Sequence, residues 1–178
     1  MKINNEEIRK LLVKHGWRED RNVPLPVYLD NLEIPLNVKQ LISNIYGLEI
    51  VDKDGYKRIF KVKEENLKYL EELAEEHLED TGLSSKFYHI GEMSEYPGSI
   101  AIDEYGRFFL INDSLVYCGD CLESFLGTVA FGFRCGLTIA ENGSTLWTYN
   151  NQDTGYKFDT KEGWLGEDSS LTWDVIKG

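Results

Sequence analysis

The chain has 178 residues, of which 42% are hydrophobic and 28% charged, and its formal net charge at pH 7 is -12. This length suffices to bury about two thirds of the unfolded surface in one core, and the composition excludes an intrinsically disordered chain. We find no apolar signal-peptide core among the first ten residues and no run of the ~18 apolar residues that a membrane span needs. With an odd number of cysteines, three, we expect a cytoplasmic protein in a reducing compartment.

The negative charge is concentrated in the later part of the chain. Residues 1–62 carry 11 Lys and Arg against 9 Asp and Glu, whereas residues 63–178 carry 8 against 22. Such a charge balance repels nucleic acid and anionic membranes, and it favours a basic protein as partner.

The first part of the chain predicts two helices. Apolar residues at helical spacing indicate an amphipathic helix over residues 5–15, with an asparagine as its cap and Gly16 as its stop. Residues 21–37 contain three of the four prolines and are expected to be extended. A second helix is predicted from Leu36 to Tyr46 and is closed by Gly47.

A hairpin and the clearest helix follow. Two runs rich in β-formers flank the turn at residues 52–55, which ends in glycine, so residues 48–62 predict a hairpin. From Lys63 to Asp80, leucines form one helical stripe and glutamates occupy the other faces, and Gly82 ends this helix.

The middle of the chain predicts a meander of short strands. The expected strands are residues 87–90, 99–102, 107–111 and 115–118. A last helix over residues 122–129 is expected to have Asp120 as its cap. Strands grouped between helices indicate an α+β fold, an antiparallel sheet meander packed against helices from the N-terminal part and a short helix after the sheet. Beyond residue 133 only a hairpin over residues 137–149 is indicated.

Five stretches in this order resemble the SUKH superfamily of immunity proteins, specifically its third branch. They read LLVKHGWREDRNV, LISNIYGLEI, FYHIGE, IAIDEYGRFFLI and CLESFLGTVAFG. The sequence departs from the family pattern at Asp20 and His89. The resemblance implies a SUKH-like single domain over residues 1–133, and residues 134–178 form a C-terminal extension of unknown role that is expected to pack on the same domain. The family-motif positions, expected to be structural, are Gly16, Trp17, Arg21, Gly47, Gly91, Asp103 and Gly106.

The resemblance implies a binding protein rather than an enzyme, because bacterial members neutralise polymorphic toxins by direct attachment. Toxins of this kind include nucleases and nucleic-acid deaminases, which bind phosphate backbones and therefore tend to be basic. The expected partner is a cognate basic toxin domain, and no cofactor, metal or catalytic residue is expected. The candidate contacts are Glu72, Glu75, Glu76, Glu92, Glu95, Tyr96, Asp103, Glu104 and Asp113. An interaction module of the same fold without a toxin is the alternative.

Two motifs have competing interpretations. Trp17 and Arg21 have the residue types of a binding hot spot, but we favour a structural role in which the indole covers the end of the first helix and the guanidinium bonds helix-end carbonyls or a carboxylate. Cys118 and Cys121 form a Cys-x-x-Cys pair before a helix, the arrangement of thiol–disulfide oxidoreductases. They come after a meander rather than after the first strand of a βαβ unit, so this alternative ranks below partner binding.

Overall fold

A computed structural model describes residues 3–52, 54–94, 98–132, 135–159 and 163–164. Its centre is a ten-stranded antiparallel sheet in which every strand pairs with its neighbours in sequence. The strands are β1 Glu49–Val51, β2 Lys57–Ile59, β3 Phe87–Met93, β4 Ser99–Asp103, β5 Phe108–Ile111, β6 Leu115–Gly119, β7 Leu137–Ile139, β8 Ser144–Trp147, β9 Asp153–Asp159 and β10 Gly163–Trp164. Within the described ranges, no helix combines the length and the apolar character needed to cross a bilayer.

Helices precede, interrupt and follow the first six strands. They are α1 Glu6–Lys14, α2 Val27–Asp30, α3 Leu36–Ile45, the 3-10 turn η1 Glu64–Asn66, α4 Leu67–Thr81, α5 Leu122–Val129 and the 3-10 turn η2 Glu141–Gly143. This arrangement confirms the α+β class and the antiparallel meander expected from the sequence.

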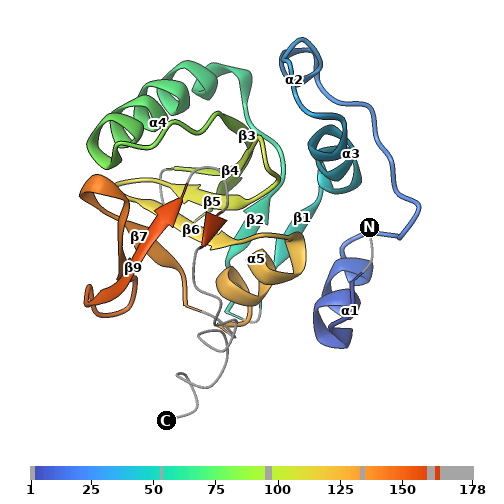
Figure 1. Cartoon of the computed structure of the whole chain (residues 1–178). Helices are drawn as coiled ribbons and strands as arrows, with labels where there is room; N and C mark the ends of the chain where they lie inside the picture. The colour runs from blue at the N-terminus through green and yellow to red at the C-terminus, as the bar shows by residue number, and fades with distance from the viewer. Residues whose placement is uncertain (1–2, 53, 95–97, 133–134, 160–162, 165–178) are drawn as a thin grey trace.

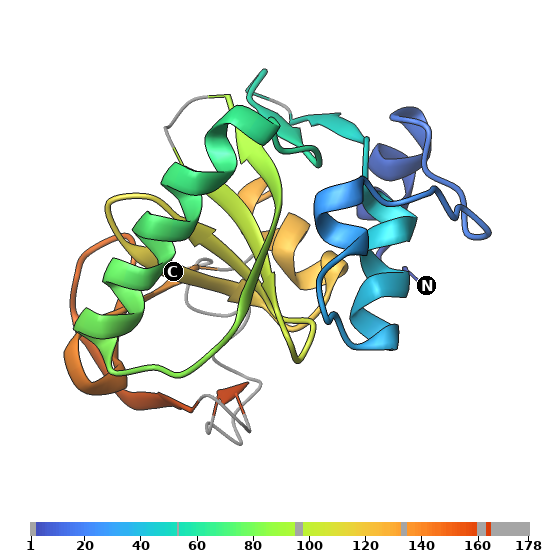
Figure 2. The same cartoon turned by 90° about the horizontal axis from the view of Figure 1, so that it is seen from above.

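Helices cover both faces of the sheet (Figures 1 and 2). The helix α4 lies over one face, while α1, α3 and α5 lie on the other. Because successive residues of a strand point to opposite faces, a strand buried on both sides is apolar throughout. In β5, Phe108 belongs to the core under α5 and Phe109 to the core under α4.

The C-terminal extension continues the sheet. β7 pairs with β6 in the register Tyr117↔Leu137, and β8 and β9 follow in the same meander. Phe158 of β9 is 4% exposed and packs in the core beneath α4. Residues on both sides of position 133 therefore share one hydrophobic core.

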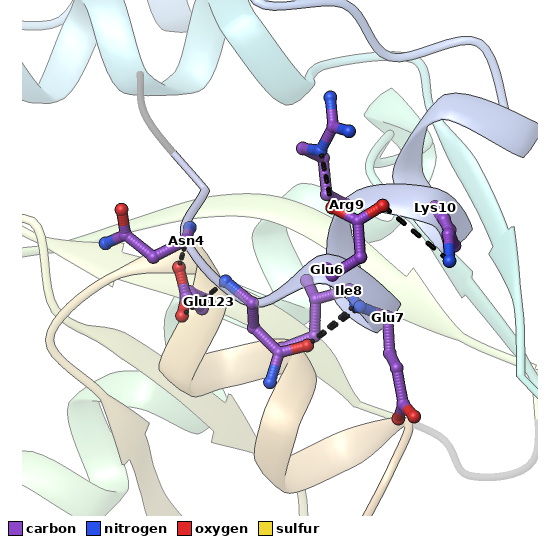
Figure 3. Close-up of polar contacts among 8 residues, drawn as sticks. Asn4, Glu6, Glu7, Ile8, Arg9, Lys10 and Glu123 are labelled. Carbon is purple, nitrogen blue, oxygen red and sulfur yellow. Dashed lines mark hydrogen bonds and ion pairs between the residues drawn. The ribbon is translucent and has the colours of Figure 1, made fainter.

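The N-terminus of α1 is attached to α5 by a single carboxylate (Figure 3). One oxygen of Glu123 accepts a hydrogen bond from the Asn4 backbone N–H at 2.7 Å, and the other accepts from the Asn5 N–H at 3.1 Å. The Asn5 side chain in turn caps α1 by accepting from the N–H groups of Glu7 and Ile8. Two helices separated by more than a hundred residues are thus joined through backbone donors.

Several elements differ from the sequence prediction. The segment 21–37, expected to be extended, contains the short helix α2, because Pro26 at its N-cap has a backbone conformation suited to starting a helix. The cap of α5 is Cys121, whose sulfur accepts from the Ser124 N–H at 3.4 Å, whereas Asp120 accepts from the Ser124 hydroxyl. The predicted turn at residues 52–55 lies partly outside the described residues, at position 53.

Candidate partner-binding surface

Trp17 is buried and Arg21 is half-buried in the helical layer. Trp17 is 5% exposed and belongs to the core formed with α1, α3 and α5. The Arg21 guanidinium donates to the backbone oxygen of Asn44 at 2.9 Å and to that of Tyr46 at 2.6 Å, at the C-terminal end of α3. The guanidinium therefore bonds carbonyls at the end of a helix, as the structural interpretation expects, and the burial of Trp17 is consistent with that interpretation.

Two family-motif glycines allow a close approach or a tight turn. A β-carbon at Gly91 would lie 2.5 Å from the backbone oxygen of Ile59, where β3 contains a bulge against β4. Gly106 has φ +87° in the β4–β5 turn, a conformation that side chains with a β-carbon rarely adopt. Neither glycine offers a side chain to a partner.

Asp103 is a buried structural residue, so its predicted role as a partner contact is wrong. Its carboxyl is fully buried and accepts from the backbone N–H groups of Tyr105 and Arg107 at 3.0 and 2.9 Å. The Arg107 side chain donates to the second oxygen at 2.6 Å and lies between the rings of Tyr105 and Phe158. Burial raises the pKa of Asp103, and the adjacent guanidinium opposes this rise. An aspartate in a turn is expected to be exposed, but the carboxylate of Asp103 is buried because it accepts the hydrogen bonds that hold the β4–β5 turn.

Other predicted acids are divided between structural and exposed roles. Glu92 is half-buried and accepts from the Lys63 backbone N–H at 3.1 Å and from the Asn66 amide at 3.0 Å. Glu104 is half-buried and accepts from the Lys86 N–H at 2.7 Å. Asp113 is exposed in the β5–β6 turn. Glu95 and Tyr96 lie outside the described residues.

The outward face of α4 carries the predicted acids Glu72, Glu75 and Glu76, and all three are exposed. The buried residues of this helix, Leu70, Ala74 and Thr81, lie on the opposite side because successive residues turn by about 100°. We call the exposed acids of α4 the acidic ridge. They are Glu71, Glu72, Glu75, Glu76, Glu79 and Asp80.

The acidic ridge has little internal charge compensation. Lys68 forms an exposed ion pair with Glu72 at 3.4 Å, and among the described residues no cation is paired with the other ridge acids. Tyr69 lies on α4 just before the ridge and is 55% exposed. Sequence reasoning missed Tyr69, although its position off the leucine stripe was a signal that it would face outward.

The thiols do not have the arrangement of a redox pair. Cys118 lies in β6 and is 3% exposed. Burial raises the pKa of its thiol to about 12. Cys121 is exposed at the start of α5. Because the thiolate is the attacking species in disulfide exchange, a buried Cys118 with a raised pKa is poorly suited to this chemistry. Within the described part of the chain, no group of three or more potential metal ligands occurs.

His89 is a buried histidine that stays neutral. It is 5% exposed, and its Nδ1 lies 2.8 Å from the Ser99 hydroxyl on the neighbouring strand. Burial lowers its pKa from 6.5 to about 4. Its burial and its contact with Ser99 indicate a packing role within the sheet.

The burial of neutral His89 predicts that the protein loses stability in acid. In the unfolded chain His89 binds a proton below pH 6.5, whereas in the folded chain it does so only near pH 4. The stability that depends on neutral His89 is therefore complete above pH 6.5 and is lost as pH falls to about 4. The free energy of unfolding is expected to drop by about 3 kcal/mol across this window. Urea denaturation at pH 7.5 and 4.5 measures the drop. The variant His89→Gln should show a smaller pH dependence, and an unchanged slope would contradict the assignment to His89.

Together these features define an α+β protein with a ten-stranded antiparallel meander, helices on both faces and one helix with a strongly acidic outer face. No family model matches the chain, and no curated protein or solved structure matches it either.

Proposed function

We propose that this protein is an immunity-type inhibitor that binds a basic toxin domain through the acidic ridge of α4. The observation that carries the proposal is the exposure of Glu72, Glu75 and Glu76 on a helix whose opposite face is anchored in the core beneath it. A ridge on a packed helix holds its charges in fixed positions, so a partner with a matching basic surface meets a preorganised site.

The target chemistry follows from the charge. Nucleases and nucleic-acid deaminases hold their phosphate backbone with Lys and Arg, and an acidic ridge presents carboxylates in place of those phosphates. Tyr69 adds the kind of aromatic residue that supplies binding energy at the centre of interfaces. The inhibitor acts by occupying the toxin surface, with no bond made or broken.

Charge reversal on the ridge tests the proposal. The partner to be tested is any toxin domain found in a gene adjacent to that of this chain, and co-expression with this chain should suppress its toxicity. We expect the double variant Glu75→Lys, Glu76→Lys to associate about tenfold more slowly at low salt and to show a weaker dependence on ionic strength. Stopped-flow measurements of the association rate provide the readout.

The matched control is Glu7→Lys combined with Glu19→Lys, which changes the net charge equally at two exposed positions in the N-terminal part of the chain, on the other side of the sheet from α4. Its association rate should stay closer to that of the unaltered chain. Equal slowing in both variants would mean that only the net charge matters, and an unchanged rate in the ridge variant would eliminate the ridge as the docking surface. Failure to neutralise any neighbouring toxin domain would favour the interaction-module alternative.

A further inference from the structure

The 3-10 turn η2 contains the only Asn-Gly pair of the sequence, Asn142 followed by Gly143. Asn142 is exposed and has φ 57° and ψ 27°, the left-handed conformation that residues with a β-carbon rarely adopt. Its side-chain amide is therefore accessible to water, and it stands directly before a residue that has no side chain.

An Asn-Gly pair can lose ammonia without an enzyme, because glycine has no β-carbon to hinder ring closure. The glycine backbone nitrogen attacks the carbon of the asparagine side-chain amide, and the new N–C bond closes a succinimide. The amide nitrogen leaves as ammonia together with the proton of the backbone N–H. Water then opens the ring at either carbonyl and gives aspartate or isoaspartate. In isoaspartate the main chain runs through the former side chain, so the backbone gains one methylene group.

The folded turn holds the attacking nitrogen away from this reaction. Gly143 is buried, and its N–H donates to the backbone oxygen of Ala140 at 3.2 Å. The Ser144 hydroxyl donates to the backbone oxygen of Glu141 at 2.9 Å, and the Ala140 N–H donates to the backbone oxygen of Ser144 at 2.8 Å. Hydrogen bonds thus close the turn at both ends, and the Gly143 nitrogen has to leave its acceptor before it can attack.

Gly143 also packs closely against strand β9. A β-carbon at this position would lie 3.1 Å from the backbone oxygen of Phe158 and 4.0 Å from the side chain of Leu83. A backbone lengthened at Asn142 would displace Gly143 from these neighbours, because a closely packed interior has no space for an added methylene. Phe158 belongs to the core beneath α4, so this displacement would loosen the contact between the C-terminal extension and that core.

We propose that the Asn142-Gly143 pair is a deamidation site that the closed turn η2 protects, and that isoaspartate formed there separates η2 from Phe158. Local opening of the turn sets the rate, because only the open turn frees the Gly143 nitrogen. The product is a chain whose C-terminal extension is held less firmly. This inference is independent of the proposed function, since it involves no partner.

Peptide mapping by mass spectrometry measures the rate of deamidation at Asn142. The full chain is incubated at mildly alkaline pH in native buffer and, in parallel, in urea above the midpoint of unfolding. We expect the rate in native buffer to be about tenfold lower, because the turn must first open. Asn151 is the internal reference, since it is also exposed with φ 57° but is followed by Gln152. Equal rates in the two buffers, or a reaction at Asn142 in urea no faster than at Asn151, would overturn the proposal.

A second variant tests whether opening of the turn sets the rate. Ser144→Ala removes the hydroxyl that donates to Glu141, and it should raise the rate at Asn142 in native buffer about fivefold, the effect of one lost hydrogen bond on the opening equilibrium. Ser114→Ala is the matched control, because it also removes a half-buried hydroxyl from a turn of the meander. It should leave the rate unchanged, and equal rates in the two variants would contradict control by the turn.

The variant Asn142→Asp separates the two consequences of deamidation, because it adds the negative charge and keeps the length of the backbone. The isoaspartate form, purified after incubation, is compared with this variant by urea unfolding. We expect a lower unfolding midpoint for the isoaspartate form, since only this form displaces Gly143 from Phe158. Equal midpoints would show that the added methylene does not disturb this contact and would refute the second half of the proposal.

Discussion

Replacing Asp103 by alanine is expected to lower the free energy of unfolding by about 3 to 5 kcal/mol, the usual effect of removing one member of a buried ion pair. The substitution removes the acceptor for two backbone N–H groups in the β4–β5 turn and for the Arg107 side chain. Arg107, which also packs against the rings of Tyr105 and Phe158, would lose the acceptor that it has in Asp103. Denaturant unfolding at pH 7 measures the loss.

Asp113→Ala is the control, because this acid is exposed in the next turn of the meander. Its effect on stability should stay within about 0.5 kcal/mol. Partner binding separates the two possible roles of Asp103, since a structural acid alters the folded fraction while the affinity of the folded molecules remains the same. A folded Asp103→Ala variant with normal stability but reduced affinity would contradict the structural role and support a direct contact of Asp103 with the partner.

Phe158→Ala should destabilise the whole protein by about 3 to 5 kcal/mol, although it lies in the C-terminal extension. Its ring centroid is 5.8 Å from that of Phe109 and 5.3 Å from that of Tyr117. It also lies 4.7 Å from the guanidinium carbon of Arg107. Alanine would therefore open a cavity beneath α4 and expose one side of the buried ion pair.

Tyr149→Ala provides the comparison within the same extension, because Tyr149 is 61% exposed. It should change the midpoint of urea unfolding very little. If Phe158→Ala unfolded in a separate, earlier transition while the remaining sheet stayed intact, the extension would be an independent unit. A single cooperative transition is expected, since strands before and after position 133 share a core.

Much of the fold was predictable because short sequence patterns indicate where its helices and strands begin and end. The helix α4 combines a leucine stripe with a left-handed glycine stop at Gly82, and α1 combines an asparagine cap with its own stripe. The strands β9 and β10 were missed. β9 includes a glycine with φ +78° and carries little apolar alternation, so its pairing depends on the strand beside it rather than on its own residues.

The candidate surface was predictable in part. The exposure of the α4 glutamates follows from helical periodicity, and their fixed orientation follows from the packed leucine stripe. The roles of Glu92 and Glu104 were not accessible, since their hydrogen-bond partners lie 29, 26 and 18 residues away. A glutamate that will accept a backbone N–H has the same local sequence as one that faces water.

The sequence by itself determined the α+β class, the order of most elements and the acidity of α4, because each depends on periodicity, turn residues or composition. The tertiary structure alone decided that Asp103 is buried, that Phe158 unites the extension with the sheet, and that Glu92 accepts hydrogen bonds from Lys63 and Asn66. The physical reason is the separation along the chain of the residues that interact. Spacing along the chain encodes which face a residue occupies, whereas burial and hydrogen-bond partners are set by segments that come together only when the meander closes.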